Sequence, residues 1–187
     1  DADTEVTVTS GATEALQATM LAFLNPGDEV VVFEPFYDAY PPQVEFAGGK
    51  LVPVRMQTPD WVFDPDELAR AFTARTKLIL INTPHNPTGK VFTPEELDLI
   101  AELCTLHDVL AVTDEVYDRI LYDGAQHVPI ATRQGMWDRT ITINSTGKTF
   151  SMTGWKIGYT IAPAPLSQAI RRAHQFITFA TSTPFQE

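Results

Sequence analysis

The sequence predicts a doubly wound, mainly parallel α/β sheet with helices on both faces, a three-layer α/β/α architecture. Short continuous apolar runs, such as residues 30–33 and 78–81, are typical of strands that are buried on both faces. Amphipathic helical patterns separate these runs, and strands that alternate with helices favour parallel strand–helix–strand units. The 187 residues, of which 44% are hydrophobic and 20% charged, are enough for one domain with a sizeable core.

The first predicted strand, residues 6–9, enters a helix through Ser10-Gly11-Ala12-Thr13-Glu14. Leu16 and Met20 lie on the apolar face of this helix, which Asn25-Pro26-Gly27 ends. A helix that begins in this way leaves backbone N–H groups free at its start, and Gly11 allows a ligand to approach closely. The segment is a candidate phosphate cradle. A plain helix cap by Ser10 is the alternative.

Strands are next expected at residues 30–33, 51–54 and 78–81, of which the first and the last are buried, and Asp64 caps a helix before the last of them. Tyr37 follows the first of these strands. Its ring can stack on a planar ligand, and packing in the core is the alternative.

The strand at residues 78–81 runs into the loop Asn82-Thr83-Pro84-His85-Asn86-Pro87-Thr88-Gly89-Lys90. Two prolines and a glycine restrict its backbone. A rigid loop that presents Asn86 at the carboxyl end of a strand is a candidate for ligand contact. His85 has no Cys, Asp or Glu at metal-ligand spacing, so we interpret it as structural and expect no metal site.

A helix is expected from Thr93 onward, and a buried strand follows at residues 109–112. Asp114 and Tyr117 come at the end of this strand. A buried acid is costly unless it meets a cation or a donor. On a short helical turn, a spacing of three lets both side chains face one ligand. A solvated pair of Asp114 and Glu115 that caps a helix is the alternative.

Lys148 follows the predicted strand at residues 139–143, in a segment whose Gly, Ser and Thr residues favour a loop over a helix. The Gly-Lys-Thr sequence at Lys148 does not complete a nucleotide-binding P-loop, because position 142 is Thr142 instead of glycine. A second interpretation is an amine that, desolvated and near Lys156, loses its proton and forms a Schiff base with an aldehyde. A solvated loop lysine is the alternative.

A strand at residues 159–162 and an amphipathic helix at residues 165–179 complete the predicted fold. A parallel sheet gathers the carboxyl ends of its strands into one crevice. The candidate groups there comprise a phosphate cradle, an aromatic face, hydrogen-bonding groups, an acid for a ring nitrogen and an aldehyde-condensing amine. This set fits pyridoxal 5'-phosphate, whose ring absorbs the electrons of a substrate α-carbon. The residues are Gly11, Ala12, Thr13, Tyr37, Asn86, Asp114, Tyr117, Ser145 and Lys148.

Four motifs then carry a resemblance to a known family. They are Ser-Gly-Ala-Thr-Glu-Ala from Ser10, Asn-Thr-Pro-His-Asn-Pro-Thr-Gly from Asn82, Thr-Asp-Glu-Val-Tyr from Thr113, and Gly-Lys-Thr-Phe-Ser-Met-Thr-Gly-Trp-Lys-Ile-Gly from Gly147. In order and spacing they resemble the large domain of class I (fold type I) pyridoxal-phosphate-dependent aminotransferases. The Pro-Phe-Tyr-Asp-Ala-Tyr and Met-Thr-Gly-Trp-Lys sequences are similar to the branch of the kynurenine, methionine and glutamine-phenylpyruvate aminotransferases and some succinyldiaminopimelate aminotransferases.

The resemblance implies a role for each residue of the ring site. Lys148 would be the Schiff-base lysine and would move the proton between the substrate α-carbon and the cofactor. Asp114 would pair with the pyridine nitrogen. Asn86 and Tyr117 would hydrogen-bond the ring oxygen, and Tyr37 would stack on the ring.

The resemblance also implies that Ala12, Thr13, Ser145 and Lys156 hold the cofactor phosphate. Many relatives carry arginine where this chain has Lys156, which keeps the charge but gives up bidentate geometry. Residues 1–187 would be the cofactor-binding large domain of a longer, homodimeric protein. The N-terminal segment and the C-terminal small domain, with the arginine for the substrate carboxylate, would lie outside them.

The expected activity is transfer of an amino group between an α-amino acid and an α-keto acid. A cysteine-S-conjugate β-lyase is an alternative, because both reactions begin with removal of the same α-proton. A non-catalytic aminotransferase-like domain is the other alternative.

Composition narrows the partners further. The net charge of −11, without a basic cluster, argues against nucleic acid or an anionic membrane as a partner. No apolar run approaches the length of a membrane span. The single cysteine, Cys104, lies at an apolar position of a helical pattern, which is consistent with a reducing compartment, and we expect the cytoplasm.

Overall fold

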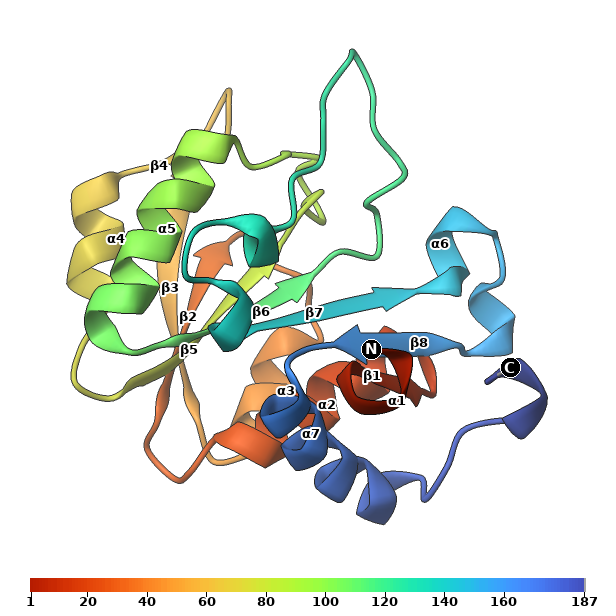
Figure 1. The fold of residues 1–187 in the computed structure, drawn as a ribbon. Helices are drawn as coiled ribbons and strands as arrows, with labels where there is room; N and C mark the ends of the chain where they lie inside the picture. The colour runs from red at the N-terminus through yellow and green to blue at the C-terminus, as the bar shows by residue number, and fades with distance from the viewer. Residues whose placement is uncertain (187) are drawn as a thin grey trace.

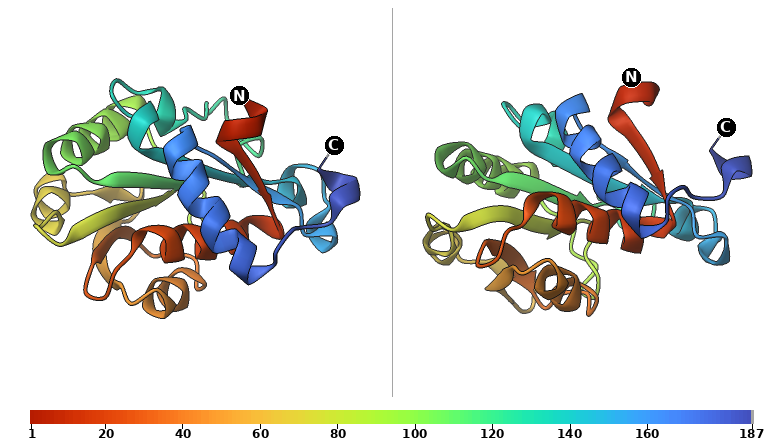
Figure 2. Two further views of the ribbon diagram at one scale, coloured as in Figure 1. Left: turned by 60° about the horizontal axis from the view of Figure 1, so that its bottom comes forward. Right: turned by 90° about the horizontal axis from the view of Figure 1, so that it is seen from below.

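The computed structural model describes residues 1–186, which form an eight-stranded sheet with helices packed on both faces (Figures 1 and 2). The strands are β1 (Val6–Thr9), β2 (Glu29–Glu34), β3 (Lys50–Gln57), β4 (Val62–Phe63), β5 (Thr76–Asn82), β6 (Leu110–Asp114), β7 (Thr140–Ser145) and β8 (Gly158–Ile161). The α-helices are α1 (Ala2–Glu5), α2 (Gly11–Phe23), α3 (Tyr40–Phe46), α4 (Pro65–Ala71), α5 (Pro94–His107), α6 (Thr146–Thr149) and α7 (Ala164–Ile177). The 3₁₀ turns are η1 (Ile130–Thr132), η2 (Trp137–Arg139), η3 (Thr153–Trp155) and η4 (Thr183–Phe185).

The strand order is β1-β8-β7-β6-β5-β2-β3-β4. Strands β3, β2, β5, β6 and β7 run parallel to one another, whereas β8 is antiparallel to both of its neighbours and β4 is antiparallel to β3. The predicted fold class, a mainly parallel sheet with flanking helices, is confirmed. Every strand expected from the sequence is present, and the short edge strand β4 is an addition.

The parallel register brings the carboxyl ends of the central strands to one edge of the sheet. Asn82 of β5 pairs with Asp114 of β6, and Asp114 pairs with Ile143 of β7. The end of each central strand therefore lies beside the end of the next, and the residues that follow these ends meet at one place.

Two hydrophobic cores flank the sheet. Helices cover both faces of the sheet (Figure 2). In β2, Val30 and Val32 belong to the core with α2, α3 and α7, whereas Val31 and Phe33 belong to the core with α4 and α5. All four side chains are buried. A strand that buries both faces has no polar side, which explains the continuous apolar runs of the sequence.

The start of α2 differs from a plain helix cap. The Ser10 side chain makes no capping hydrogen bond, and Gly11 has a φ of +78°, a conformation that favours glycine. Gly158 of β8 lies directly against this turn, because a Cβ there would come within 2.3 Å of the Gly11 carbonyl carbon. The backbone of β8 therefore fixes the position of the first turn of α2.

The prediction of a loop around Lys148 is wrong for residues 146–149. They form the single helical turn α6, closed by a hydrogen bond from the N–H of Phe150 to the carbonyl of Thr146 at 3.1 Å. One turn is too short to show apolar periodicity, and local backbone hydrogen bonds are enough to form it.

The turn that carries Tyr117 also differs from the expected short helical turn. The N–H of Asp118 bonds to the carbonyl of Glu115 at 2.9 Å, and the N–H of Ile120 bonds to the carbonyl of Tyr117 at 2.8 Å, so the backbone forms successive tight turns instead of an α-helix. Asp114 itself is the last residue of β6.

None of the helices within residues 1–186 combines the length and the apolar character needed to cross a membrane. Cys104 of α5 is a free, buried thiol in the core beneath α4 and α5, as the sequence pattern predicts. Burial raises the pKa of this thiol to about 12, so it is an inert core residue at neutral pH.

Candidate functional site

The carboxyl ends of the strands open into a cavity of roughly 430 Å³. This volume lies in the range of small-molecule sites. All the site residues expected from the sequence line it, namely Gly11, Ala12, Thr13, Tyr37, Asn86, Asp114, Tyr117, Ser145, Lys148 and Lys156. The structure therefore brings together residues that are far apart in the sequence.

One end of the cavity is suited to an anion. Residues 11–13 begin helix α2, and the first N–H groups of a helix have no partner within it. Ser145, at the end of β7, and Lys156, just after η3, line the same cavity. Backbone donors, a hydroxyl and an ammonium group are the contacts that a phosphate requires.

The other chemical feature of the cavity is the carboxyl of Asp114, which is 5% exposed. Burial raises its pKa to about 6, and the charge of Glu115 adds to this. The Tyr40 hydroxyl, the N–H of Val116 and the charge of Lys148 act in the opposite direction. At pH 7 the carboxyl is therefore mostly ionised and can hold a proton on a neighbouring ring nitrogen.

Tyr40 also lines the cavity, although the sequence pattern does not predict it there. It is buried, and its hydroxyl donates a hydrogen bond to Oδ2 of Asp114 at 2.8 Å. Burial raises the pKa of this phenol well above its usual value, and the neighbouring Asp114 charge adds to the increase, so Tyr40 stays a hydrogen-bond donor. Its ring also meets the ring of Tyr37 edge to face, with centroids 5.6 Å apart. The repeat of tyrosine three residues after Tyr37 is the signal that could have revealed it.

We predict that Tyr40→Phe raises the pKa of Asp114 in the cofactor-free protein. The variant removes a donor that stabilises the ionised form, so the midpoint should move from about 6 upward by about one pH unit. The carbon-13 chemical shift of the Asp114 carboxyl, followed against pH, measures it. Tyr37→Phe is the matched control, since Tyr37 makes no hydrogen bond to Asp114, and an unchanged midpoint in Tyr40→Phe would contradict the prediction.

Asn82, a second residue that was missed, connects two parts of the site. Its Nδ2 donates to the carbonyl of Asp114 at 2.9 Å, and its Oδ1 accepts from the N–H of Asn86 at 2.6 Å. It therefore fixes the loop of Asn86 relative to the end of β6. As a polar residue at the carboxyl end of the buried strand β5, Asn82 could have been predicted from the sequence as part of the site.

Hydrogen bonds within the loop of Asn86 hold His85 in place. The N–H of His85 bonds to the carbonyl of Lys90 at 2.8 Å, and its Nδ1 lies 2.8 Å from the hydroxyl of Thr88. Burial, reinforced by the charge of Lys90, lowers the pKa of His85 to about 4, so the ring is neutral at pH 7. Among residues 1–186, no group of His, Cys, Asp and Glu side chains is arranged to hold a metal ion.

The amine of Lys148 lies over the ring of Tyr117, with Nζ 5.5 Å from the ring centroid. The negative face of an aromatic ring attracts an ammonium group at this distance. Lys148 is exposed, so the desolvation expected from the sequence is not supplied by the residues that the structure describes. The amine is accessible to a ligand from the open side of the cavity.

The geometry agrees with comparisons to known proteins. A family model described as aminotransferase class I and II matches residues 1–187. The chain belongs to this family. It is 44% identical over 196 residues to kynurenine–oxoglutarate transaminase 3 of Rattus norvegicus, covering all of this chain and 43% of that protein. It is 47% identical over 189 residues to a probable N-succinyldiaminopimelate aminotransferase of Mycobacterium tuberculosis (strain ATCC 25618 / H37Rv), covering all of this chain and 47% of that one.

Solved structures of aminotransferases show the same fold. The N-succinyldiaminopimelate aminotransferase from Mycobacterium tuberculosis superposes with a TM-score of 0.96 at 46% identity, over all of this chain and 49% of that one. YbdL from Escherichia coli, described with a methionine aminotransferase function, also gives 0.96, at 40% identity and with the same coverage. The chain spans about half the length of the relatives it matches.

Proposed function

We propose that the protein containing this chain is a pyridoxal-phosphate-dependent aminotransferase that moves an amino group between an α-amino acid and an α-keto acid. The observation that carries the proposal is a single cavity lined by Lys148, Asp114 and the free N-terminus of α2. These supply an aldehyde-condensing amine, an acid for a ring nitrogen and a phosphate cradle. Membership of the aminotransferase family supports the same assignment.

The residues of the cavity fit this cofactor. The start of α2, with Ser145 and Lys156, would hold the phosphate, and Tyr37 would cover one face of the ring. Asn86 and Tyr117 would donate hydrogen bonds to the ring oxygen. When bound, the cofactor supplies an electron sink for the substrate α-carbon.

The role of Lys148 follows from its position. Its amine would hold the cofactor covalently, and as a free amine Nζ would be placed to take up and give back the α-proton of the substrate. The ring of Tyr117 lies beneath Nζ and would help to hold the amine in place. Asp114 would keep the ring nitrogen protonated throughout.

A substrate carboxylate requires a planar donor, and within residues 1–186 no arginine lines the cavity. Arg119 follows the cavity residue Tyr117 by two positions, but its side chain is exposed and pairs with Asp118 at 3.5 Å. We propose that the arginine for the carboxylate, and the surface that shields Lys148 from water, lie outside residues 1–187.

We predict that residues 1–187 expressed alone bind pyridoxal 5'-phosphate but show no saturable transamination, because bidentate positioning of the carboxylate is missing. A single-turnover absorbance assay with methionine, kynurenine or glutamine measures conversion to the pyridoxamine form. The full-length protein is the control. Saturable conversion by the isolated chain would show that the carboxylate site lies within these residues.

The experiment that tests the function uses the full-length protein with an amino acid and a keto acid. Amino transfer should exceed the pyruvate released from a cysteine conjugate, and the opposite ratio would assign a β-lyase.

We further propose that the full-length protein is a cytoplasmic homodimer. The exposed aromatic rings of Phe176 and Phe179 beside the end of α7 support an additional contact surface there.

A further inference from the structure

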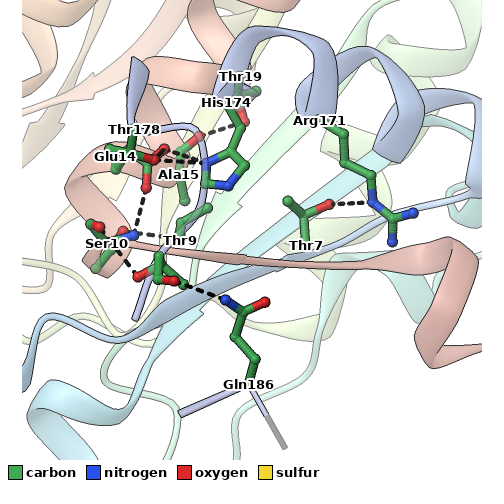
Figure 3. Close-up of polar contacts among 12 residues, drawn as sticks. Thr7, Thr9, Ser10, Glu14, Ala15, Thr19, Arg171, His174, Thr178 and Gln186 are labelled. Atoms are coloured by element: carbon green, nitrogen blue, oxygen red, sulfur yellow. Dashed lines mark hydrogen bonds and ion pairs between the residues drawn. The ribbon is translucent and has the colours of Figure 1, made fainter. Parts of the chain in front are cut away.

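A polar cluster at the end of α7 holds the first turn of α2 from outside the cavity (Figure 3). Glu14, in this turn, is 7% exposed and does not line the cavity. Its Oε2 accepts a hydrogen bond from the N–H of Ser10 at 2.5 Å. Its Oε1 lies 2.5 Å from Nδ1 of His174 and accepts the hydroxyl of Thr178 at 3.1 Å. The carboxylate therefore joins the start of α2 to the end of α7.

The location of Glu14 has an electrostatic consequence. A carboxylate in the first turn of a helix interacts favourably with the helix dipole, but it repels a phosphate that binds at the same end. His174 lies partly buried beside the carboxylate, and the hydrogen bond between its Nδ1 and Oε1 of Glu14 weakens the field of the negative charge at the start of α2. Glu14 also occupies the N–H of Ser10, so the N–H groups that remain for the phosphate are those of residues 11–13.

Further contacts connect the same part of the chain to this turn. The hydroxyl of Ser10 lies 3.3 Å from that of Thr181, which follows α7, and Gln186 donates to the carbonyl of Thr181 at 2.9 Å. On the other side, Gly158 of β8 touches the backbone of Gly11. Because α7 directly follows β8 in the chain, one continuous segment positions the cradle from both sides.

We propose that Glu14 and His174 are a positioning pair for the cofactor phosphate. Glu14 aims the N–H groups of residues 11–13 into the cavity, and the hydrogen bond from His174 weakens the repulsion that the Glu14 carboxylate exerts on the phosphate. The inference rests on the proposed function, because it takes the phosphate of the cofactor as the bound anion. Neither side chain touches the cavity, so both act through the backbone and the charge of the first turn of α2.

The test uses the full-length protein, prepared free of cofactor and titrated with pyridoxal 5'-phosphate and, separately, with pyridoxal, which lacks the phosphate. His174→Leu leaves the Glu14 charge uncompensated, so its affinity for pyridoxal 5'-phosphate should fall about tenfold. Its affinity for pyridoxal should be unchanged. An equal loss for both compounds, or no loss for either, would overturn the proposal.

A second change separates charge from packing. Adding Glu14→Gln to His174→Leu removes the uncompensated charge while an amide oxygen remains to accept the N–H of Ser10. The double variant should therefore bind pyridoxal 5'-phosphate about threefold more tightly than His174→Leu does. A further loss would show that His174 acts through packing alone. His174→Gln, which keeps a donor for Glu14, should fall between the wild type and His174→Leu, and it replaces the leucine variant if that variant does not fold.

Arg75→Leu is the matched control. Glu29 is another buried carboxylate, paired with Arg75 at 2.5 Å and hydrogen-bonded by Thr73, at the amino end of β2 and away from the cavity. Arg75→Leu should lower the melting temperature of the cofactor-free protein without changing either affinity. Borohydride reduction identifies the bonded residue in the wild type. If the wild type forms no covalent bond between the cofactor and Lys148, the proposed function is contradicted. If that bond forms but the His174 variants lose affinity for both compounds equally or for neither, only the positioning pair is contradicted.

Discussion

Replacing Lys148 by alanine in the full-length protein is expected to abolish the covalent bond to pyridoxal 5'-phosphate that borohydride traps, and to lower amino transfer by roughly four orders of magnitude. The variant removes the amine that we propose both to hold the cofactor and to act as the base for the α-proton. The proposed phosphate cradle at the start of α2 and the acid Asp114 remain in the cavity. The cofactor should therefore still bind, without a covalent bond. Mass spectrometry of the reduced, digested protein locates the modified residue.

Lys156→Ala is the control for this experiment, because it removes the other lysine that lines the cavity. That variant should bind the cofactor more weakly, since it lacks the ammonium group that we expect to face the phosphate. The cofactor trapped by borohydride should still be found on Lys148. Cofactor trapped on another residue of the Lys148→Ala variant would show that the assignment of the amine is wrong.

The position of the candidate site could be predicted from the sequence because its residues follow the ends of buried strands. Asn86, Asp114 and Lys148 each stand after an apolar run, and a parallel sheet brings such ends together without any knowledge of side-chain contacts. The fold class follows from the same runs. Their order along the chain favours parallel pairing, and their lack of polar positions requires helices on both faces.

Contacts that depend on the third dimension could not be predicted in this way. The hydroxyl of Tyr40 meets Asp114 across 74 residues, and His174 meets Glu14 across 160. The spacing of neither pair follows a helical or strand period, so the sequence does not predict these contacts. Helix α3 was missed because Pro41 and Pro42 interrupt the pattern, although proline is compatible with the first turn of a helix.

The surroundings of Asp114 show that part of the site is built at the expense of stability. Its pKa of about 6 lies above the ordinary value of about 3.9 for an unfolded chain. The folded state therefore favours the protonated form. The contribution of this carboxyl to stability is present at low pH and is lost as the pH rises from about 4 through 6. At neutral pH the buried charge opposes folding until a cationic ring nitrogen binds beside it.

Asp114→Asn should therefore separate stability from activity. The amide has the shape of the carboxyl and can still accept the hydroxyl of Tyr40, but it carries no charge. In the cofactor-free protein at pH 7, the free energy of unfolding should rise by about 2 kcal/mol, since a buried charge is removed. Urea unfolding of the wild type and the variant measures this difference. At pH 4, where the carboxyl is protonated, the gain should largely disappear.

The same substitution should lower the rate of the single-turnover half-reaction by roughly three orders of magnitude, because a neutral amide no longer favours a proton on the ring nitrogen and the electron sink is weakened. Affinity for the cofactor should change far less, since the proposed phosphate cradle at the start of α2 is left intact. Asp118→Asn, in the turn that follows β6 but outside the cavity, is the control and should leave the rate unchanged. Near-normal turnover in Asp114→Asn would mean that the carboxylate only positions the ring, and that its burial at the end of β6 has no electronic role.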